Sequence, residues 1–454
     1  MNLSADDIEI TLNVLQQIAD NPALIDSHDR VKSLIAKIYK QGKKAKKQHN
    51  KQKCQLQDKA LISTTDIVKF QQNPRETTEQ LIARDSGVSR NFIKPKSCYI
   101  CKNLYTEIHH FYHLLCPSCA RFNYAKREQH TDLTGRIALV TGGRIKIGYQ
   151  TALRLLQDGA KVIVTSRFPG DTLKRFRNEP DFEQWQKRLC IYGLDLRDLP
   201  AVESFIKFLI PRETHLDILI NNAAQTIKRP LAFYQHLLEQ EKCSYQGLNN
   251  NHYFASRLLE SKLNNENICS EINVYFPKQM LDRDGQQLDQ RPLNSWKLKL
   301  DEVSTLELLE VQLVNTIAPF MLNSQLKPLL TRSPFAQRFI INVSAMEGQF
   351  NREHKTVFHP HTNMAKAALN MMTRTSGADY ARDRIYMNSV DTGWITDENP
   401  YPQRQNAQKQ RGFYPPLDII DGMARIYDPI IQAIENPHQP LFGHFLKNYI
   451  PYPW

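Results

Sequence analysis

Apolar residues recur at helical spacing at the start of the chain. Ser4 precedes two acids, as at a helix N-terminus, and apolar residues then follow three or four positions apart: Ile8, Leu12, Leu15 and Ile18. A second helix is predicted from Ser27 into a lysine-rich run. Residues 41–95 are rich in Gln, Lys and Thr without clear periodicity. The pattern therefore predicts a helical, basic and partly flexible segment over residues 1–95.

Beyond residue 133, short apolar runs alternate with helical patterns. The runs read RIALVTGG, KVIVTSR, LCIYGLDL, LDILINNAA, RFIINVSA and RIYMNSVDTG. Strands that alternate with helices predict βαβ units and a parallel sheet with right-handed crossovers. About eighty residues separate Asn222 from the helical pattern LELLEVQLVN, far more than an ordinary connection needs. We therefore expect an α/β fold over residues 134–454, with an insertion at about 227–305 that covers one side of the sheet.

Composition places the chain among ordinary globular proteins. Hydrophobic residues make up 41% of the 454 residues, which allows a sizeable core and excludes a wholly disordered chain. No apolar run approaches the ~18 residues of a membrane helix. The first residues carry acids rather than a basic stretch followed by an apolar run, so no signal peptide is expected. These features predict a soluble, cytoplasmic protein without a membrane span.

Positive charge is concentrated near the N-terminus. The net charge is +12, and residues 31–60 alone hold ten Lys against one Asp. Such a run suits an acidic partner protein, an anionic membrane or nucleic acid, although a solvated helix face or a flexible arm explains it as well. Nucleic acid is not favoured, because the run lacks the interleaved aromatic residues that stack on bases.

Four of the eight cysteines form two CxxC pairs. Fourteen residues separate the pair Cys98 and Cys101 from the pair Cys116 and Cys119. Each pair presents two thiolates on one turn, and two pairs complete the tetrahedral sulfur site that Zn²⁺ accepts. Four protein ligands leave no position for a substrate, so we expect a structural zinc that holds a module over residues 96–125. The histidines at 109, 110 and 113 lie between the pairs and could replace one thiolate.

Glycines and polar residues mark the ends of several predicted strands. A glycine-rich turn over residues 141–148 follows the first strand, where backbone N–H groups and a helix N-terminus can meet a pyrophosphate. Asp195 ends the third strand and Asn222 lies just after the fourth. Asn315 and Lys366 lie on later helices. Taken together and in this order, the motifs resemble the short-chain dehydrogenase/reductase family over residues 134–454.

The resemblance implies a seven-stranded, doubly wound Rossmann sheet that binds NAD(P), with GHFLKNY (443–449) as its last strand. The residues that it assigns to the cofactor, with the basic residues near them, are Thr141, Gly142, Arg144, Lys146, Ile147, Gly148, Arg167, Asp195, Asn222, Ala223 and Lys366. A small-molecule substrate is implied as well, and a homo-oligomer is left open.

The end of the second strand favours NADP(H) over NAD(H). An NAD site needs a carboxylate there to bind the ribose 2′-hydroxyl, but the strand ends Thr165-Ser166-Arg167. A guanidinium at Arg167 would pair with a 2′-phosphate, and Arg144 and Lys146 add positive charge in the first turn. Lys146 also stands where most family members have Gly. The alternative is that these basic residues are merely solvated.

The catalytic positions depart from the family. Asn315 and Lys366 are present, but Thr362 stands where the family has Tyr and Ala345 where it has Ser. A threonine hydroxyl is far less acidic than a phenol and cannot replace it unaided. His361, in the run His359-Pro360-His361, titrates near neutrality and is the expected proton donor, unless this run is an ordinary surface loop.

Two functions agree with these residues. The favoured one is an NADP(H)-dependent oxidoreductase that transfers a hydride between nicotinamide and a carbonyl or alcohol substrate through an atypical proton relay. Its expected catalytic residues are Asn315, Lys366, His361 and Thr362. The alternative is a catalytically inactive NADP(H)-binding sensor or scaffold, which contacts a partner through the zinc module and the basic N-terminal segment.

Overall fold

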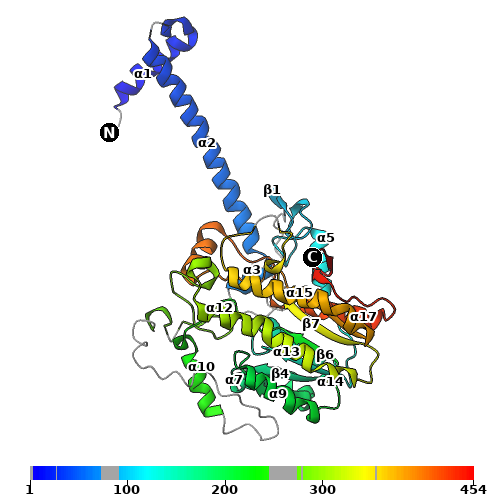
Figure 1. Ribbon diagram of the computed structural model, residues 1–454. Helices are drawn as coiled ribbons and strands as arrows, with labels where there is room; N and C mark the ends of the chain where they lie inside the picture. The colour runs from blue at the N-terminus through cyan, green and yellow to red at the C-terminus, as the bar shows by residue number, and fades with distance from the viewer. Residues whose placement is uncertain (1–3, 27, 73–90, 245–272, 278–279, 353–354) are drawn as a thin grey trace.

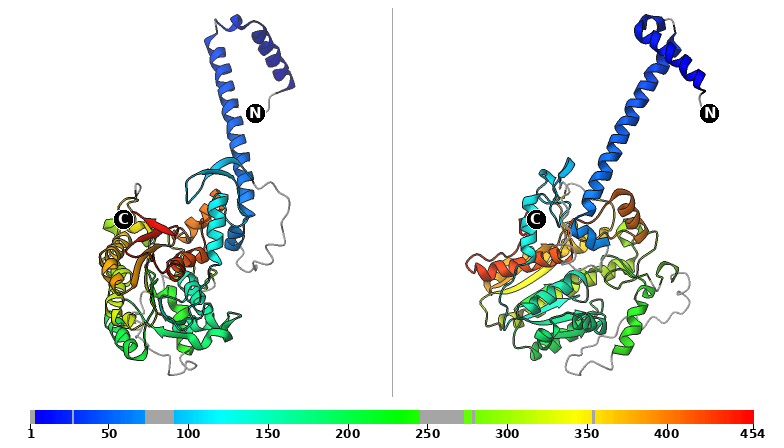
Figure 2. Two further views of the ribbon diagram at one scale, coloured as in Figure 1. Left: turned by 90° about the vertical axis from the view of Figure 1, so that its right-hand side faces the viewer. Right: turned by 180° about the vertical axis from the view of Figure 1, so that it is seen from behind.

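The computed structural model describes residues 4–26, 28–72, 91–244, 273–277, 280–352 and 355–454. An N-terminal helical arm, a small cysteine-rich module and an α/β body follow one another along the chain (Figure 1). The arm comprises α1 (Ala5–Asp20), η1 (Pro22–Ile25), α2 (Asp29–Ser63) and α3 (Asp66–Gln72). Helix α2 projects from the body and carries α1 at its far end (Figures 1 and 2).

Helix α2 is 35 residues long and contains the whole lysine-rich run up to Ser63. Residues 41–63 belong to the segment expected to be partly flexible, and they form the C-terminal part of this helix, because Lys, Gln and Ala form helices readily without an apolar stripe. Residues 73–90 of that stretch lie outside the described residues. The lysines of α2 are exposed, and a partner for them stays a prediction. Within the described ranges, no helix has the length and apolar character needed to cross a membrane.

The cysteine-rich module lies between the arm and the body. It consists of an antiparallel pair, β1 (Asn91–Ser97) and β2 (Leu104–Glu107), followed by α5 (Pro117–Arg127). Asp58, near the end of α2, forms an ion pair with Lys96 at 2.7 Å and accepts the Ile93 N–H at 3.2 Å. Apolar residues of all three parts share one core, among them Leu61 from the arm, Leu115 from the module and Leu417 from the body.

The body is built on an eight-stranded sheet in the order β10-β9-β8-β7-β6-β3-β4-β5. Its strands are β3 (Ile137–Thr141), β4 (Lys161–Ser166), β5 (Leu189–Gly193), β6 (Ile218–Asn221), β7 (Arg338–Ser344), β8 (Ile385–Asp391), β9 (Phe445–Lys447) and β10 (Ile450–Tyr452). Strands β3 to β9 are parallel, which confirms the expected doubly wound α/β fold. The antiparallel β10 is an addition to the seven expected strands, and the chain reverses before it at Asn448 and Tyr449, both with positive φ.

Helices cover both faces of the sheet, and successive strand residues point to opposite layers. Ala138 and Val140 of β3 pack in the layer with α6 (Lys146–Gln157), α7 (Pro169–Arg177) and α17 (Ile419–Glu435). Ile137 and Leu139 pack in the other layer, with α9 (Leu199–Arg212), α13 (Ala318–Gln325) and α14 (Lys327–Thr331). Helix α15 (Pro360–Arg382) follows β7 and contacts β8.

Described residues of the insertion lie at the carboxyl ends of the strands, and the expectation that the insertion covers one side of the sheet stays a prediction. Its helix α10 (Leu231–Ser244) packs against α7. Gln286 reaches the glycine turn by a hydrogen bond to Arg144 at 2.8 Å. The 3-10 turns η8 (Ser295–Lys297) and η9 (Leu300–Glu302) lead into α12 (Thr305–Gln312). The insertion therefore walls the edge where ligands of such sheets bind.

Buried ion pairs join the module to the body. Arg127, at the end of α5, donates to both carboxylate oxygens of Asp418 at 2.7 and 3.0 Å and lies 3.1 Å from Asp421. Asp418 is the N-cap of α17, and Tyr112 of the module donates to Asp421 at 2.5 Å. Because these groups are almost completely buried, each charge depends on its partners for stability.

The replacement Arg127→Met is expected to lower the free energy of unfolding by about 3–5 kcal/mol, because it leaves two carboxylates buried without their cation. Urea titration followed by circular dichroism measures this loss. Arg121 lies on the same helix but is exposed, so the matched Arg121→Met change should stay within about 0.5 kcal/mol of wild type. Equal losses in both variants would contradict the role given to Arg127.

Candidate functional site

A cavity of about 1460 Å³ lies at the carboxyl ends of the parallel strands. Thr362 and nearly all residues expected at the cofactor line it: Gly142, Arg144, Lys146, Ile147, Gly148, Arg167, Asp195, Asn222, Ala223 and Lys366. Thr141, Asn315 and His361 do not line the cavity, so a role for them would be to position the residues that do. The sequence motifs therefore meet around one cavity, although more than two hundred residues separate the first from the last.

Hydrogen bonds hold the glycine turn against Asn222 and Ala223, which directly follow β6. The Thr141 hydroxyl oxygen accepts the backbone N–H groups of Asn222 and Ala223 at 3.1 and 3.0 Å. The Asn222 side-chain amide donates back to the carbonyl oxygens of Thr141 and Gly142. A Cβ at Gly148 would collide with that amide, and Gly142 has a φ of +67°. The turn thus needs its glycines for close packing.

This turn fits a dinucleotide pyrophosphate. Helix α6 begins at Lys146, and its first residues line the cavity, so the positive end of the helix dipole lies at the cavity wall. Lys146 has a φ of +56°, in the left-handed region where the family usually has Gly. Its ammonium adds positive charge to the same wall.

Arg167 directly follows β4, the strand beside the glycine turn, and it lines the cavity. Its guanidinium lies 4.5 Å from the ring centroid of Tyr234, which belongs to the insertion helix α10. Asp195 beside it is held by Arg197, whose Nε and Nη2 donate to the carboxylate at 3.0 and 2.6 Å. Burial alone raises the pKa of Asp195, but the bonds with Arg197 hold that pKa below its usual range.

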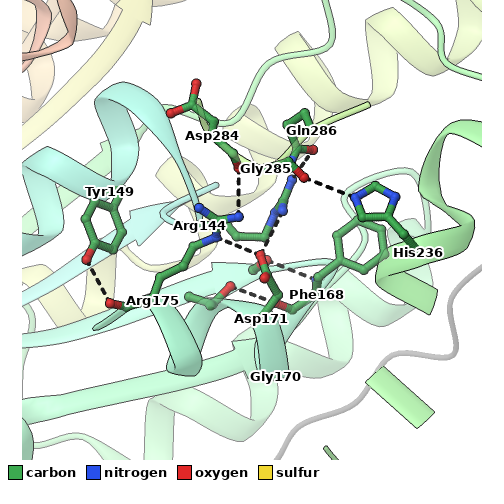
Figure 3. Close-up of polar contacts among 12 residues, drawn as sticks. Arg144, Tyr149, Phe168, Gly170, Asp171, Arg175, His236, Asp284, Gly285 and Gln286 are labelled. Atoms are coloured by element: carbon green, nitrogen blue, oxygen red, sulfur yellow. Dashed lines mark hydrogen bonds and ion pairs between the residues drawn. The ribbon is translucent and has the colours of Figure 1, made fainter. Parts of the chain in front are cut away.

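Arg144 is already engaged in a buried network (Figure 3). Its Nη1 forms an ion pair with Asp171 of α7 at 2.9 Å, and its Nη2 donates to Gln286. Arg175 donates to the same Asp171 oxygen and to the carbonyl of Asp284. The charge of Arg144 is thus compensated within the protein. Its structural role is to tie the insertion to α7, a role the sequence did not indicate.

Lys366 and Thr362 face the cavity from α15. The Lys366 ammonium donates to the carbonyl oxygen of Val343 at 2.7 Å. Burial lowers its pKa to about 8, against the opposing charge of Glu347. The Thr362 hydroxyl is buried and has no hydrogen-bond partner among the described residues. Its hydroxyl is therefore available to a ligand.

The two other catalytic positions of the family are Asn315, which bonds to the backbone, and Ala345, which has no hydroxyl. Asn315 lies in a π-helical turn, η10 (Leu313–Ile317), and bonds both the N–H and the carbonyl of Gln225, at 2.7 and 3.0 Å. Ala345 lines the cavity where the family has Ser. The neighbouring Ser344 donates to Asn370 at 2.6 Å, so its hydroxyl is engaged on α15.

The structure corrects the expected place of His361. Its Nε2 lies 3.4 Å from the Glu307 carboxylate on α12, and it is buried away from the cavity. His359 does line the cavity, stacked on Trp296 of the insertion with ring centroids 3.9 Å apart. Burial lowers the pKa of His359. The geometry therefore gives His361 no contact with a reacting group, because α15 turns the two histidines to different sides.

The four expected zinc ligands converge. The sulfur atoms of Cys98, Cys101, Cys116 and Cys119 all lie within 4.8 Å of one another. The sulfurs of Cys101 and Cys116 are 3.7 Å apart, close to the ~3.8 Å edge of a tetrahedron with Zn–S bonds of ~2.3 Å. The backbone N–H of Cys116 donates to the Cys98 sulfur. These donors fit Zn²⁺ with no protein position left open for chemistry.

The cavity also includes residues that the sequence did not indicate. Tyr99 and Lys102, from the turn of the first cysteine pair, line it. The Tyr99 hydroxyl accepts the backbone N–H of Trp394 at 3.1 Å, just after β8. Only the docking of the module onto the body brings these residues to the site, so neither periodicity nor spacing could have found them.

Comparison with known proteins agrees with this geometry. The short chain dehydrogenase family matches residues 136–243. The uncharacterized protein R665 of Acanthamoeba polyphaga mimivirus is 33% identical over 357 residues, which cover 76% of this chain and 73% of that protein. A short chain dehydrogenase/reductase of Colletotrichum higginsianum is 39% identical over 99 residues, 21% of this chain and 24% of that protein.

Solved structures of similar fold include the carbonyl reductase from chicken fatty liver, determined with NADPH bound. It is 18% identical, covers 71% of this chain and all of its own, and superposes with a TM-score of 0.42.

We expect one zinc ion per chain in the purified wild type, measured by elemental analysis. Cys116→Ser should lower the content severalfold, because three thiolates hold the ion less firmly than four. Cys54 lies on α2, outside the cluster, so Cys54→Ser is the matched control and should keep the wild-type content. A zinc-free wild type, or undiminished zinc in Cys116→Ser, would refute the site.

Proposed function

The chain belongs to the short-chain dehydrogenase/reductase family, and on that premise we propose that it is an NADP(H)-dependent oxidoreductase that interconverts a carbonyl compound and an alcohol. One observation carries the proposal: the glycine turn, Asn222, Thr362 and Lys366 line a single cavity at the carboxyl edge of the sheet. The volume of about 1460 Å³ leaves room for a substrate beside a dinucleotide.

The cofactor would lie across the strand ends. The glycine turn and the start of α6 would hold its pyrophosphate, and the end of β4 its adenosine. Lys366 would hold the nicotinamide ribose, as the family resemblance implies. When bound, NADPH supplies the hydride.

Arg167 supports the choice of NADPH. It follows β4 where an NAD site would carry a ribose-binding acid, and it lines the cavity with its guanidinium over Tyr234. A guanidinium forms strong paired bonds with a phosphate. Asp195 does not compete for the ribose hydroxyls, because Arg197 engages its carboxylate.

A relay through Thr362 and Lys366 would replace the missing phenol. The two residues are one helical turn apart on α15 and therefore share a face. The Thr362 hydroxyl would give its proton to the substrate oxygen and regain one from the Lys366 ammonium through a bridging water, since the two groups share no hydrogen bond in the structure. Because the pKa of Lys366 is lowered to about 8, this ammonium gives up a proton more readily than an ordinary lysine does.

Arg167→Asp should remove or reverse a preference for NADPH over NADH, because the replacement repels the 2′-phosphate and offers a ribose-binding acid. The wild-type preference should be about tenfold or more, as expected for charge-assisted bonds of about 1.5–3 kcal/mol. Fluorescence titration with both nucleotides measures it. Arg374 is exposed on α15, so Arg374→Asp controls for the charge change and should keep the preference. Equal wild-type affinities for the two nucleotides would defeat the assignment.

The relay predicts how carbonyl reduction depends on pH. The rate should be constant below about pH 8 and fall above it, because the acid form of Lys366 is the active one. Thr362→Val should reduce turnover on the order of 10²-fold, and Thr362→Ser should restore most of it. NADPH oxidation over a panel of aldehydes and ketones, measured from pH 6 to 10, gives the profile.

His361→Gln serves as the comparison, since His361 contacts Glu307 and not the cavity, and it should keep the wild-type profile. Full activity in Thr362→Val with unchanged NADPH affinity would rule out the relay. Tight NADPH binding without turnover on any substrate would instead favour a nucleotide-binding scaffold, for which the exposed lysines of α2 offer a contact surface.

A further inference from the structure

Positive charge exceeds negative charge at one end of the cavity, the end next to β8 and β9. Apart from Lys366, four cationic residues line this end: Lys102, Arg352, Lys355 and Lys447. Two lining acids, Glu347 and Asp391, accompany them. Burial and then the charge of Glu347 raise the pKa of Asp391, which weakens its negative charge. Counted formally, this end carries two more positive than negative charges, four against two.

Three of these cations come from separate parts of the chain and line the same cavity. Lys102 follows Cys101 of the module, Arg352 follows β7, and Lys447 ends β9. Burial lowers the pKa of Lys447, and the charge of nearby Asp391 raises it. The positive charges of Lys102 and Arg352 lower this pKa as well, as expected for like charges. Such a grouping is unfavourable without an anion and becomes favourable with one.

The partners of the three cations leave charge unbalanced. Arg352 forms an ion pair with Glu347 at 2.9 Å. Lys102 donates to the carbonyl of Tyr99, and Lys447 lies 4.7 Å from the ring centroid of Tyr452. Lys102 also has a φ of +64°, a conformation that costs a non-glycine residue roughly 1–2 kcal/mol. A lysine stands there although glycine would fit with less strain.

The phosphates of the cofactor cannot be the anion that these cations bind. The glycine turn follows β3, and β9 is four places away in the order β3, β6, β7, β8, β9. At about 4.8 Å between neighbouring strands, Lys447 is on the order of 19 Å from the pyrophosphate site. The 2′-phosphate position at β4 is one strand farther still. The cations therefore lie on the side of Lys366 away from the dinucleotide phosphates.

We infer that the substrate is an organic anion, whose carboxylate or phosphate binds to Lys102 of the zinc-binding turn together with Lys447 and Arg352. This inference rests on the proposed function for the identity of the reacting group, but the anion site itself can be measured without turnover. It also gives the zinc module a part in substrate binding, because Lys102 directly follows Cys101 and its backbone N–H donates to the carbonyl oxygen of Cys98 at 3.1 Å. Zinc would then set the position of one substrate-binding residue.

Three aldehydes of similar shape test the inference: 4-carboxybenzaldehyde, 4-formylphenyl phosphate and the neutral ester methyl 4-formylbenzoate. Each is titrated calorimetrically against the full-length, zinc-loaded protein, alone and with NADP⁺. An aldehyde with NADP⁺ forms a complex that cannot transfer a hydride, so the measurement reports binding alone. At least one anion should bind about 10- to 100-fold more tightly than the ester, the effect of charge-assisted hydrogen bonds. Comparison of the two anions tells carboxylate from phosphate.

The double variant Lys102→Met/Lys447→Met should lose this preference and keep its zinc and its affinity for NADP⁺. Each single variant should lose part of it, so a folding defect in one variant does not leave the inference untested. Lys207 is exposed on α9 and paired with Glu203, so Lys207→Met is the matched control and should keep the full preference.

Equal affinities of the three aldehydes for the wild type, or a preference that survives in the double variant, would overturn the anion site. The proposed function fails separately, if NADP⁺ does not bind or if NADPH is never oxidised. In that case the titrations without nucleotide still report whether the cations prefer an anion.

Discussion

The contact between α5 and the start of α17 is the interaction on which the rest of the site depends. Arg127 bonds the N-cap residue Asp418, and the Arg425 guanidinium reaches back to Asn123 of α5 at 2.7 Å. Helix α17 in turn packs against α6, the helix that the glycine turn opens. The cysteine-rich module is thereby fixed relative to the nucleotide end of the cavity. Without this docking, Tyr99 and Lys102 would not reach the site, and the module would be a separate unit joined only by the chain.

The sequence predicted the central strands well, because their physical signal is local. Strands β3 to β6 are mainly apolar runs buried on both faces, as parallel sheets require. Strands β7 and β8 hold more polar residues but are almost as deeply buried. The remaining elements lacked a signal of that kind. β10 is three residues long and forms only because the chain reverses at Asn448 and Tyr449. The pairing of Arg144 with Asp171 and Gln286 joins residues 27 and 142 positions apart, so spacing along the chain could not reveal it. The same is true of His361, whose contact with Glu307 depends on how α12 packs on α15.

The catalytic end of the cavity shows what the two replaced positions change. Ala345 removes a hydroxyl, and the adjacent Ser344 cannot substitute because it is bonded to Asn370 in the core. Thr362 keeps a hydroxyl but loses the acidity of a phenol. Lys366 remains. Burial lowers its pKa to about 8, although the nearby carboxylate of Glu347 opposes this shift. In the proposed relay, the proton supplied to the substrate would therefore come from an acidic ammonium rather than from an acidic hydroxyl. Such a relay would give Lys366 a role without the family's Ser and Tyr.

The two additions to the family fold, the insertion and the module, both close the same cavity from opposite ends of the sheet. The insertion contributes Gln286 near β4 and Trp296, stacked on His359, beside α15. The module contributes its first cysteine turn beyond β8. The arm is the exception, since apolar side chains of α1 and α2 such as Ile10 and Ile38 are exposed and most of α2 projects away from the body (Figures 1 and 2). The proposed zinc and anion sites would therefore be linked through the turn of Cys98 and Cys101 and the Lys102 that follows it, whereas the arm joins the module and the body only at its inner end, where Leu61 enters their shared core.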